Sequence, residues 1–130
     1  MSTRFISANP RPEDLRESND CTVRATSLAM NKPYLEVHKA YEKMGRKPRQ
    51  GVTIRTMTKA LQLLTSSDRV MIRAFQEPTF AQFAKANPKG RFIVTKRGHA
   101  VALIDGVWHD SHVSCAGARC RVKFYYEIKD

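Results

Sequence analysis

The segment from residue 98 to residue 110 holds a histidine and an aspartate at a spacing that suits acid–base chemistry. Asp105-Gly106 divides two apolar runs and predicts a two-residue β-hairpin turn of type I′. That turn fixes a register in which Ile104 pairs with Val107, Leu103 with Trp108 and Val101 with Asp110. His99 then shares a face with Asp110, its diagonal neighbour on the paired strand, within reach of a carboxylate–imidazole hydrogen bond. The hairpin therefore predicts an imidazole that is oriented by a carboxylate.

Cys21 is the best candidate for a nucleophile that this imidazole activates. Ser18, Asn19 and Asp20 are all favourable N-cap residues, so we expect a helix to begin directly before Cys21. The partial positive charge at a helix N-terminus stabilises a thiolate over a thiol, and His99 can take the proton or form an ion pair with the sulfur. The charge of Asp20 opposes this effect unless its side chain turns away from the thiol.

The elements that must position these residues form a helical N-terminal half and a β-rich C-terminal half. Periodicity and turn signals predict helices over 18–30, 33–45, 53–64 and 79–86, and strands over 70–75, 91–95, 99–104, 107–110 and 120–128. In the last strand, strict alternation places on one face Cys120, Val122, Phe124, Tyr126 and Ile128. Helices followed by an antiparallel sheet are typical of the α+β class.

Length and composition predict a single domain that spans residues 1–130, because 130 residues with 42% hydrophobic content suit one core. Residues 1–17 contain Pro10 and Pro12 and are expected to form an irregular arm. The polar first 20 residues predict no signal peptide, and the short apolar runs predict no membrane span. We therefore expect a cytoplasmic protein.

The formal net charge of +11 is concentrated in the middle of the chain, where residues 45–100 hold 12 basic and two acidic side chains. Such a field attracts polyanions, either nucleic acid or an acidic protein surface. The basic loop with Arg46, Lys47 and Arg49 is the candidate anion contact, although such a loop is more often a solvated turn.

Two short segments resemble known sequence boxes. Asn19-Asp20-Cys21-Thr22-Val23-Arg24-Ala25 and Gly98-His99-Ala100-Val101-Ala102 resemble the Cys and His boxes of the papain-like cysteine peptidases, and the order Cys…His…Asp is also theirs. The resemblance covers about residues 18–30 and 91–112, and it is closest to short single-domain papain-like proteins encoded by bacteriophages. It implies a papain-like fold and a cysteine peptidase or isopeptidase that works without a cofactor on a peptide or protein, in the host cytoplasm if phage-encoded.

The resemblance also assigns roles to individual residues. Cys21 takes the place of the nucleophile, His99 that of the base and Asp110 that of the residue orienting the base, while Trp108 resembles a shield over the His–Asp bond. The family's oxyanion-hole Gln has no counterpart, because no Gln precedes Cys21, and Asn19 is the nearest amide. The alternative is therefore a catalytically weak or inactive papain-like fold that binds nucleic acid or an acidic host protein.

The remaining histidines and cysteines give a weaker signal. His109, His112, Cys115 and Cys120 have a spacing that resembles a zinc site, but a separation of three puts the two histidines on opposite faces of an extended strand. We therefore predict no metal. Cys115 and Cys120 could pair only in an oxidising setting, and His38 is expected to be structural.

Overall fold

The computed structural model describes residues 4–65, 71–110 and 120–128. Within them the elements, in chain order, are β1 (Arg4–Ser7), α1 (Cys21–Met30), α2 (Tyr34–Lys43), α3 (Ile54–Thr65), β2 (Ile72–Arg73), α4 (Phe80–Ala86), β3 (Arg91–Lys96), β4 (His99–Ile104), β5 (Val107–Asp110) and β6 (Phe124–Ile128). The predicted α+β class is confirmed. The main helix and strand predictions hold to within a few residues, and the strand predicted over 70–75 shortens to β2.

The six strands form one mixed sheet in the order β1-β5-β4-β3-β6-β2. All neighbouring strands are antiparallel except β1, which runs parallel to β5 and pairs Phe5 with Trp108 and Ser7 with Asp110. Two expectations are thereby corrected: the sheet is not purely antiparallel, and the arm over 1–17 is not wholly irregular. The arm is ordered here because Phe5 stacks on Trp108, with ring centroids 6.5 Å apart.

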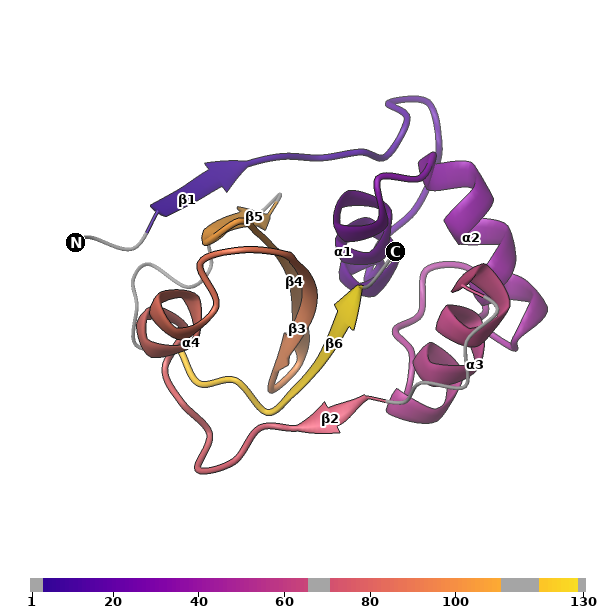
Figure 1. The fold of residues 1–130 in the computed structure, drawn as a ribbon. Coiled ribbons are helices and arrows are strands. Elements are labelled where there is room, and N and C mark those ends of the chain that lie inside the picture. The colour runs from indigo at the N-terminus through magenta and orange to yellow at the C-terminus, as the bar shows by residue number, and fades with distance from the viewer. Residues whose placement is uncertain (1–3, 66–70, 111–119, 129–130) are drawn as a thin grey trace.

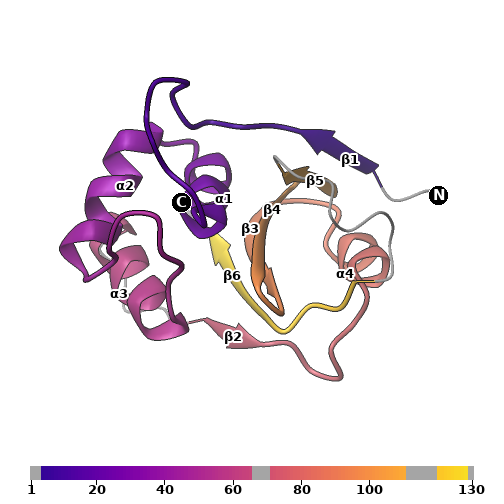
Figure 2. The ribbon, with the colours of Figure 1, turned by 180° about the vertical axis from the view of Figure 1, so that it is seen from behind.

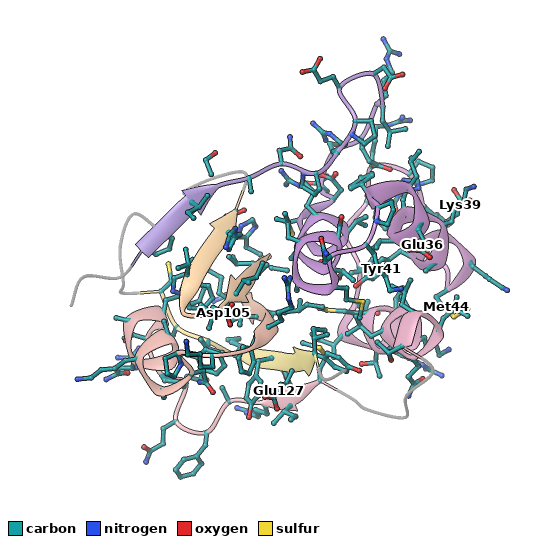
Figure 3. The ribbon with its side chains drawn as sticks, turned by 45° about the horizontal axis from the view of Figure 1, so that its top comes forward. Glu36, Lys39, Tyr41, Met44, Asp105 and Glu127 are labelled. Carbon is teal, nitrogen blue, oxygen red and sulfur yellow. The ribbon has the colours of Figure 1, made fainter. Side chains whose placement is uncertain are left out.

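Helices cover both faces of the curved sheet. Figure 1 shows α1, α2 and α3 gathered on one side and α4 on the other, and the view from behind in Figure 2 agrees. Each side has its own apolar core: Val23, Tyr41 and Tyr126 are buried on the side of the three helices, and Phe80 and Trp108 are buried beside α4. Figure 3 labels Tyr41 on α2, whose hydroxyl lies 2.8 Å from the Thr26 hydroxyl of α1. Cys21 begins α1, which packs against β4 of the sheet.

The β4–β5 hairpin has the predicted turn and register. Leu103 pairs with Trp108 and the neighbouring pairs follow the same register. Asp105 and Gly106 both have positive φ, 48° and 78°, as a type I′ turn requires. The Asp105 carboxylate, labelled in Figure 3, accepts a hydrogen bond from the Gly90 N–H at 2.9 Å and so ties the turn to the start of β3.

The last strand departs from its prediction at one point. Phe124 and Tyr126 pack on the side of the three helices, but Val122 is buried on the α4 side. The face changes because two residues lie opposite Thr95: the Lys123 N–H donates to its carbonyl at 2.8 Å, and the Phe124 N–H donates to its hydroxyl at 3.2 Å. Two residues opposite one is the arrangement of a β-bulge, which interrupts the alternation. The prediction of one continuous face is therefore wrong.

None of the helices in the described part of the chain has the length and apolar character that crossing a bilayer requires.

Candidate active site

Cys21 is the first residue of α1, where the sequence predicts it, and its side chain is partly buried. Burial on its own raises the pKa of the Cys21 thiol, but hydrogen bonds with the His99 side chain and the Ala100 N–H lower it, so that the net shift is downward. The sulfur is also near the positive end of the helix dipole, which acts in the same direction. The local structure therefore favours the thiolate.

His99 connects Cys21 to Asp110. Its Nε2 lies 2.7 Å from Oδ2 of Asp110, and both side chains are largely buried. The hydrogen bond with Asp110, followed by the one with Cys21, raises the pKa of His99 to about 9. Because Nε2 faces the carboxylate, Nδ1 is the ring nitrogen that remains for the sulfur. The expected hydrogen bond between His99 and Asp110 is confirmed.

The backbone around Asp110 is held by a strand that the sequence reasoning missed. Ser7 of β1 pairs with Asp110, and the Ala8 N–H donates to the Asp110 carbonyl at 2.9 Å. β5 is thus held between β4 and β1 at the point where it presents its carboxylate. The adjacent apolar pair Phe5-Ile6 was the available signal, but a four-residue strand shortly before two prolines gives a weak one.

The Asp20 carboxylate is bound to residues other than the thiol. Its side chain is 1% exposed and accepts a hydrogen bond from the Tyr34 hydroxyl at 2.7 Å. The other carboxylate oxygen lies 3.2 Å from Nε of Arg24 and 3.5 Å from a guanidinium nitrogen of Arg11. The Asp20 side chain makes no capping hydrogen bond to the N-terminus of α1. The negative charge beside Cys21 is therefore compensated by these partners.

The basic loop after α2 serves mainly to hold the N-terminal arm. Arg46 is 5% exposed and forms two 3.0 Å hydrogen bonds to the Glu17 carboxylate, which also lies 2.7 Å from Nε2 of His38. The Arg49 N–H donates to the same carboxylate at 2.7 Å. The expectation that Arg46 contacts an external anion is therefore wrong, because its guanidinium is buried in an internal ion pair. Lys47 and Arg49 are exposed, and His38 is structural as predicted.

Asn19 does not supply the expected oxyanion donor. Its side-chain N–H donates to the Arg49 carbonyl at 3.1 Å, and Asn19 does not line the cleft beside the sulfur. The backbone offers another donor. The first i−4 hydrogen bond of α1 runs from the Arg24 N–H to the Asp20 carbonyl, so the Cys21 N–H precedes it and has no acceptor within the helix. This N–H is therefore a backbone donor next to the thiol, in addition to the Ala100 N–H that hydrogen-bonds with the sulfur.

Trp108 is fully buried in an aromatic cluster, where it stacks on Phe80 at 4.2 Å between ring centroids and also lies near Phe5 and Phe83. Its indole N–H has no hydrogen-bond partner within the described residues. The position is that of a core residue between α4 and β1. Its role as a shield for the His–Asp pair remains a prediction.

A cleft of about 430 Å³ opens directly at Cys21 and His99. Met57 of α3 and Phe124 of β6 contribute apolar surface, and the cleft is further lined by Lys96 and Lys123. A thiol at the edge of a cleft of this size is accessible to a ligand.

The candidate zinc series is only partly described, because His112 and Cys115 lie outside the described residues. Within the described residues no group of three metal-ligating side chains gathers. Cys120 is disulfide-bonded, whereas Cys21 is a free thiol.

Comparisons of the chain with protein-family models, with curated proteins and with solved structures found no match.

Proposed function

We propose that the chain is a thiol-dependent hydrolase of the papain-like kind, acting on peptide or isopeptide bonds. The observation that carries this proposal is the continuous hydrogen-bonded chain from the Cys21 sulfur through His99 to Asp110. A nucleophile, a base within hydrogen-bond reach and a third group that orients the base are the parts that covalent acyl transfer requires.

The reaction follows from the positions of these groups. The Cys21 thiolate attacks the substrate carbonyl carbon, and the Cys21 N–H donates to the oxygen as its negative charge develops. The His99 imidazolium gives its proton to the departing amine, and the C–N bond breaks to leave a thioester. Water, deprotonated by His99, then attacks the thioester, and the C–S bond breaks to release the acid and restore the Cys21 thiolate beside the protonated His99. Asp110 holds the ring orientation and stabilises the imidazolium throughout.

Two features support catalysis over an inert core cysteine. The sulfur borders an open cleft rather than lying wholly among aliphatic side chains. The pKa values of Cys21 and His99 also shift in opposite directions, toward a thiolate–imidazolium pair. Titratable groups whose pKa values are shifted by a specific charged partner in a cleft are typical of active sites.

The same arrangement of residues serves deamidases, transglutaminases and acetyltransferases, which differ in the acyl donor and acceptor. The acyl-enzyme is common to all of them, so trapping it tests the shared chemistry. Wild-type protein is incubated with a peptide library and analysed by intact-mass spectrometry for an adduct on Cys21, with and without hydroxylamine. We expect an adduct that hydroxylamine releases as a hydroxamate, and none in Cys21→Ala. Folded wild-type protein that forms no adduct and cleaves no peptide would contradict the proposal.

One observation favours a second function, binding without catalysis. The amide nearest Cys21 donates to the Arg49 carbonyl, so the oxyanion site has a backbone donor and lacks the side-chain amide usual in the family. A basic binding protein for nucleic acid or an acidic host protein would show steep salt dependence of binding that Cys21→Ala leaves unchanged.

A further inference from the structure

The cleft beside Cys21 has a strongly one-sided charge. Two lysines and His99 line it, and no Asp or Glu is among its described lining residues. His99 adds a positive charge through neutral pH because its pKa is raised to about 9. An anionic group entering the cleft would therefore meet two ammonium groups, whereas the positive charge of His99 is offset by Asp110 and by the Cys21 thiolate.

The three cationic groups come from the ends of three adjacent strands. Lys96 is the last residue of β3 and pairs directly with His99, the first residue of β4. Lys123 directly precedes β6, whose first residue Phe124 pairs with Thr95 of β3. The bulge at Thr95 thus brings Lys123 to the same end of the sheet as Lys96.

Neither lysine has a carboxylate partner within the described residues, where the ion pairs involve other side chains. Like charges on neighbouring strands destabilise a sheet when nothing compensates them. A carboxylate supplied from outside the chain would remove this repulsion.

One wall of the cleft is apolar, although three threonines also line the cleft. Val52 and Ile54 precede or begin α3, Met57 follows one turn later, and Phe124 faces them from β6. An apolar wall next to a pair of ammonium groups fits a ligand that carries an apolar side chain and a carboxylate close together. A volume of about 430 Å³ is within the range of clefts that hold small organic ligands, and so suits a few residues of an extended chain.

We propose that this cleft binds an acidic peptide segment, with an apolar side chain against Met57 and Phe124 and a carboxylate between Lys96 and Lys123. The inference names the substrate class of the proposed hydrolase and rests on that function. A peptide fits better than a nucleic acid because base binding relies on aromatic stacking surfaces, and Phe124 is the only Phe, Tyr or Trp among the described lining residues.

Charge selectivity at the sulfur can be measured without a known substrate. The rate of Cys21 alkylation is compared for iodoacetate, which is anionic, and iodoacetamide, which is neutral, in the wild type and in Lys96→Gln and Lys123→Gln. The matched control is Lys59→Gln, because Lys59 is an exposed residue of α3 that does not line the cleft. We expect each cleft variant to lower the iodoacetate-to-iodoacetamide ratio about two- to fivefold, the range of an exposed ion pair, and Lys59→Gln to leave it unchanged.

The outcomes separate the inference from the function on which it rests. Fast alkylation with the same ratio in the wild type and both cleft variants would overturn the acidic-peptide inference and leave the hydrolase proposal standing. A Cys21 that reacts no faster than glutathione with either reagent would overturn both.

Competition distinguishes the two classes of polyanion. A short peptide with alternating Glu and Leu, its Gln-for-Glu counterpart, and a single-stranded oligonucleotide of equal charge are each tested for protection of Cys21 from iodoacetamide. We expect the acidic peptide to protect at the lowest concentration, with protection reduced in the two cleft variants. Stronger protection by the oligonucleotide, or equal protection by the Gln peptide, would overturn the inference.

Discussion

His99 and Asp110 lie on neighbouring strands of one hairpin, and their side chains meet at 2.7 Å across its open end. The Asp105-Gly106 turn sets the register of β4 and β5, and the register sets which carboxylate the imidazole can reach. A one-residue slip would turn the Asp110 carboxylate to the opposite face of the sheet. The turn is therefore a determinant of the site, although it is remote from the sulfur.

The raised pKa of His99 predicts different pH limits for hydrolysis and for alkylation. Hydrolysis needs the imidazolium to protonate the leaving amine, so its rate should fall as the pH rises through about 9. Alkylation by iodoacetamide needs only the thiolate and should not fall there. Both rates are measured from pH 5 to 10.5 on the same preparation. A hydrolysis rate that continues to rise beyond pH 9.5 would contradict a proton donor with this pKa.

Removing the imidazole should raise the pKa of the Cys21 thiol. In His99→Ala the hydrogen bond and the positive charge that lower this pKa are lost, and burial, which raises it, remains. At pH 7 an ordinary thiol is only a few per cent ionised. We therefore expect iodoacetamide to alkylate Cys21 about tenfold more slowly in His99→Ala than in the wild type. His109→Gln is the matched control, because His109 lies in β5 outside the cleft. Equal slowing in the two variants would point to a general loss of structure.

Asp110→Asn tests whether the carboxylate acts through His99. The amide preserves the shape of the side chain and removes its charge, so the pKa of His99 should fall from about 9 toward its ordinary value. The histidine ring protons report this pKa directly by NMR titration, and circular dichroism reports whether the fold is retained. A His99 pKa that stays near 9 in the folded variant would show that Asp110 does not control it.

Local signals were enough to predict the hairpin and the start of the first helix. Asp105 and Gly106 adopt the two positive φ values of the predicted turn, and Cys21 begins α1 where N-cap residues precede it. These features depend on residues close together in the sequence, for which backbone preferences decide the conformation.

Long-range ion pairs explain most of what the sequence did not reveal. Arg46 and Glu17 are 29 residues apart, and nothing in the spacing of a basic loop shows that one of its arginines turns inward to a carboxylate of the arm. The same holds for Asp20 and Tyr34, which are 14 residues apart. Ser7 and Asp110 are also far apart in the sequence, and the adjacent apolar pair Phe5-Ile6 was the only local trace of their pairing.

Tyr34→Phe should destabilise the protein, because it removes the hydroxyl that donates to the buried Asp20 carboxylate. A hydrogen bond to a charged group contributes about 1.5–3 kcal/mol, and the carboxylate would be left short of a donor. The free energy of unfolding is measured by urea denaturation. Tyr125→Phe is the control, since the Tyr125 ring packs against Phe83 and Phe92 and should tolerate loss of its hydroxyl. An equal decrease in the free energy of unfolding of the two variants would contradict the role assigned to the Tyr34–Asp20 hydrogen bond.

The Glu17 carboxylate should make the stability of the fold sensitive to acid. Burial alone raises the pKa of Glu17, but the hydrogen bonds from Arg46, His38 and the Arg49 N–H outweigh it and hold this pKa well below its usual range. A carboxyl group whose pKa is depressed by folding stabilises the native state above its unfolded pKa, near 4.5, and loses that contribution as the pH falls toward its folded value. Glu17→Gln should therefore lower the free energy of unfolding by about 3 kcal/mol at pH 7, as breaking a buried ion pair does. The difference in this free energy between the variant and the wild type should narrow below pH 4. The measurement is urea denaturation from pH 3 to 7, with Glu13→Gln, an exposed residue of the same arm, as control. A gap that is constant over this range would mean that the Glu17 charge does not hold the arm against the helices.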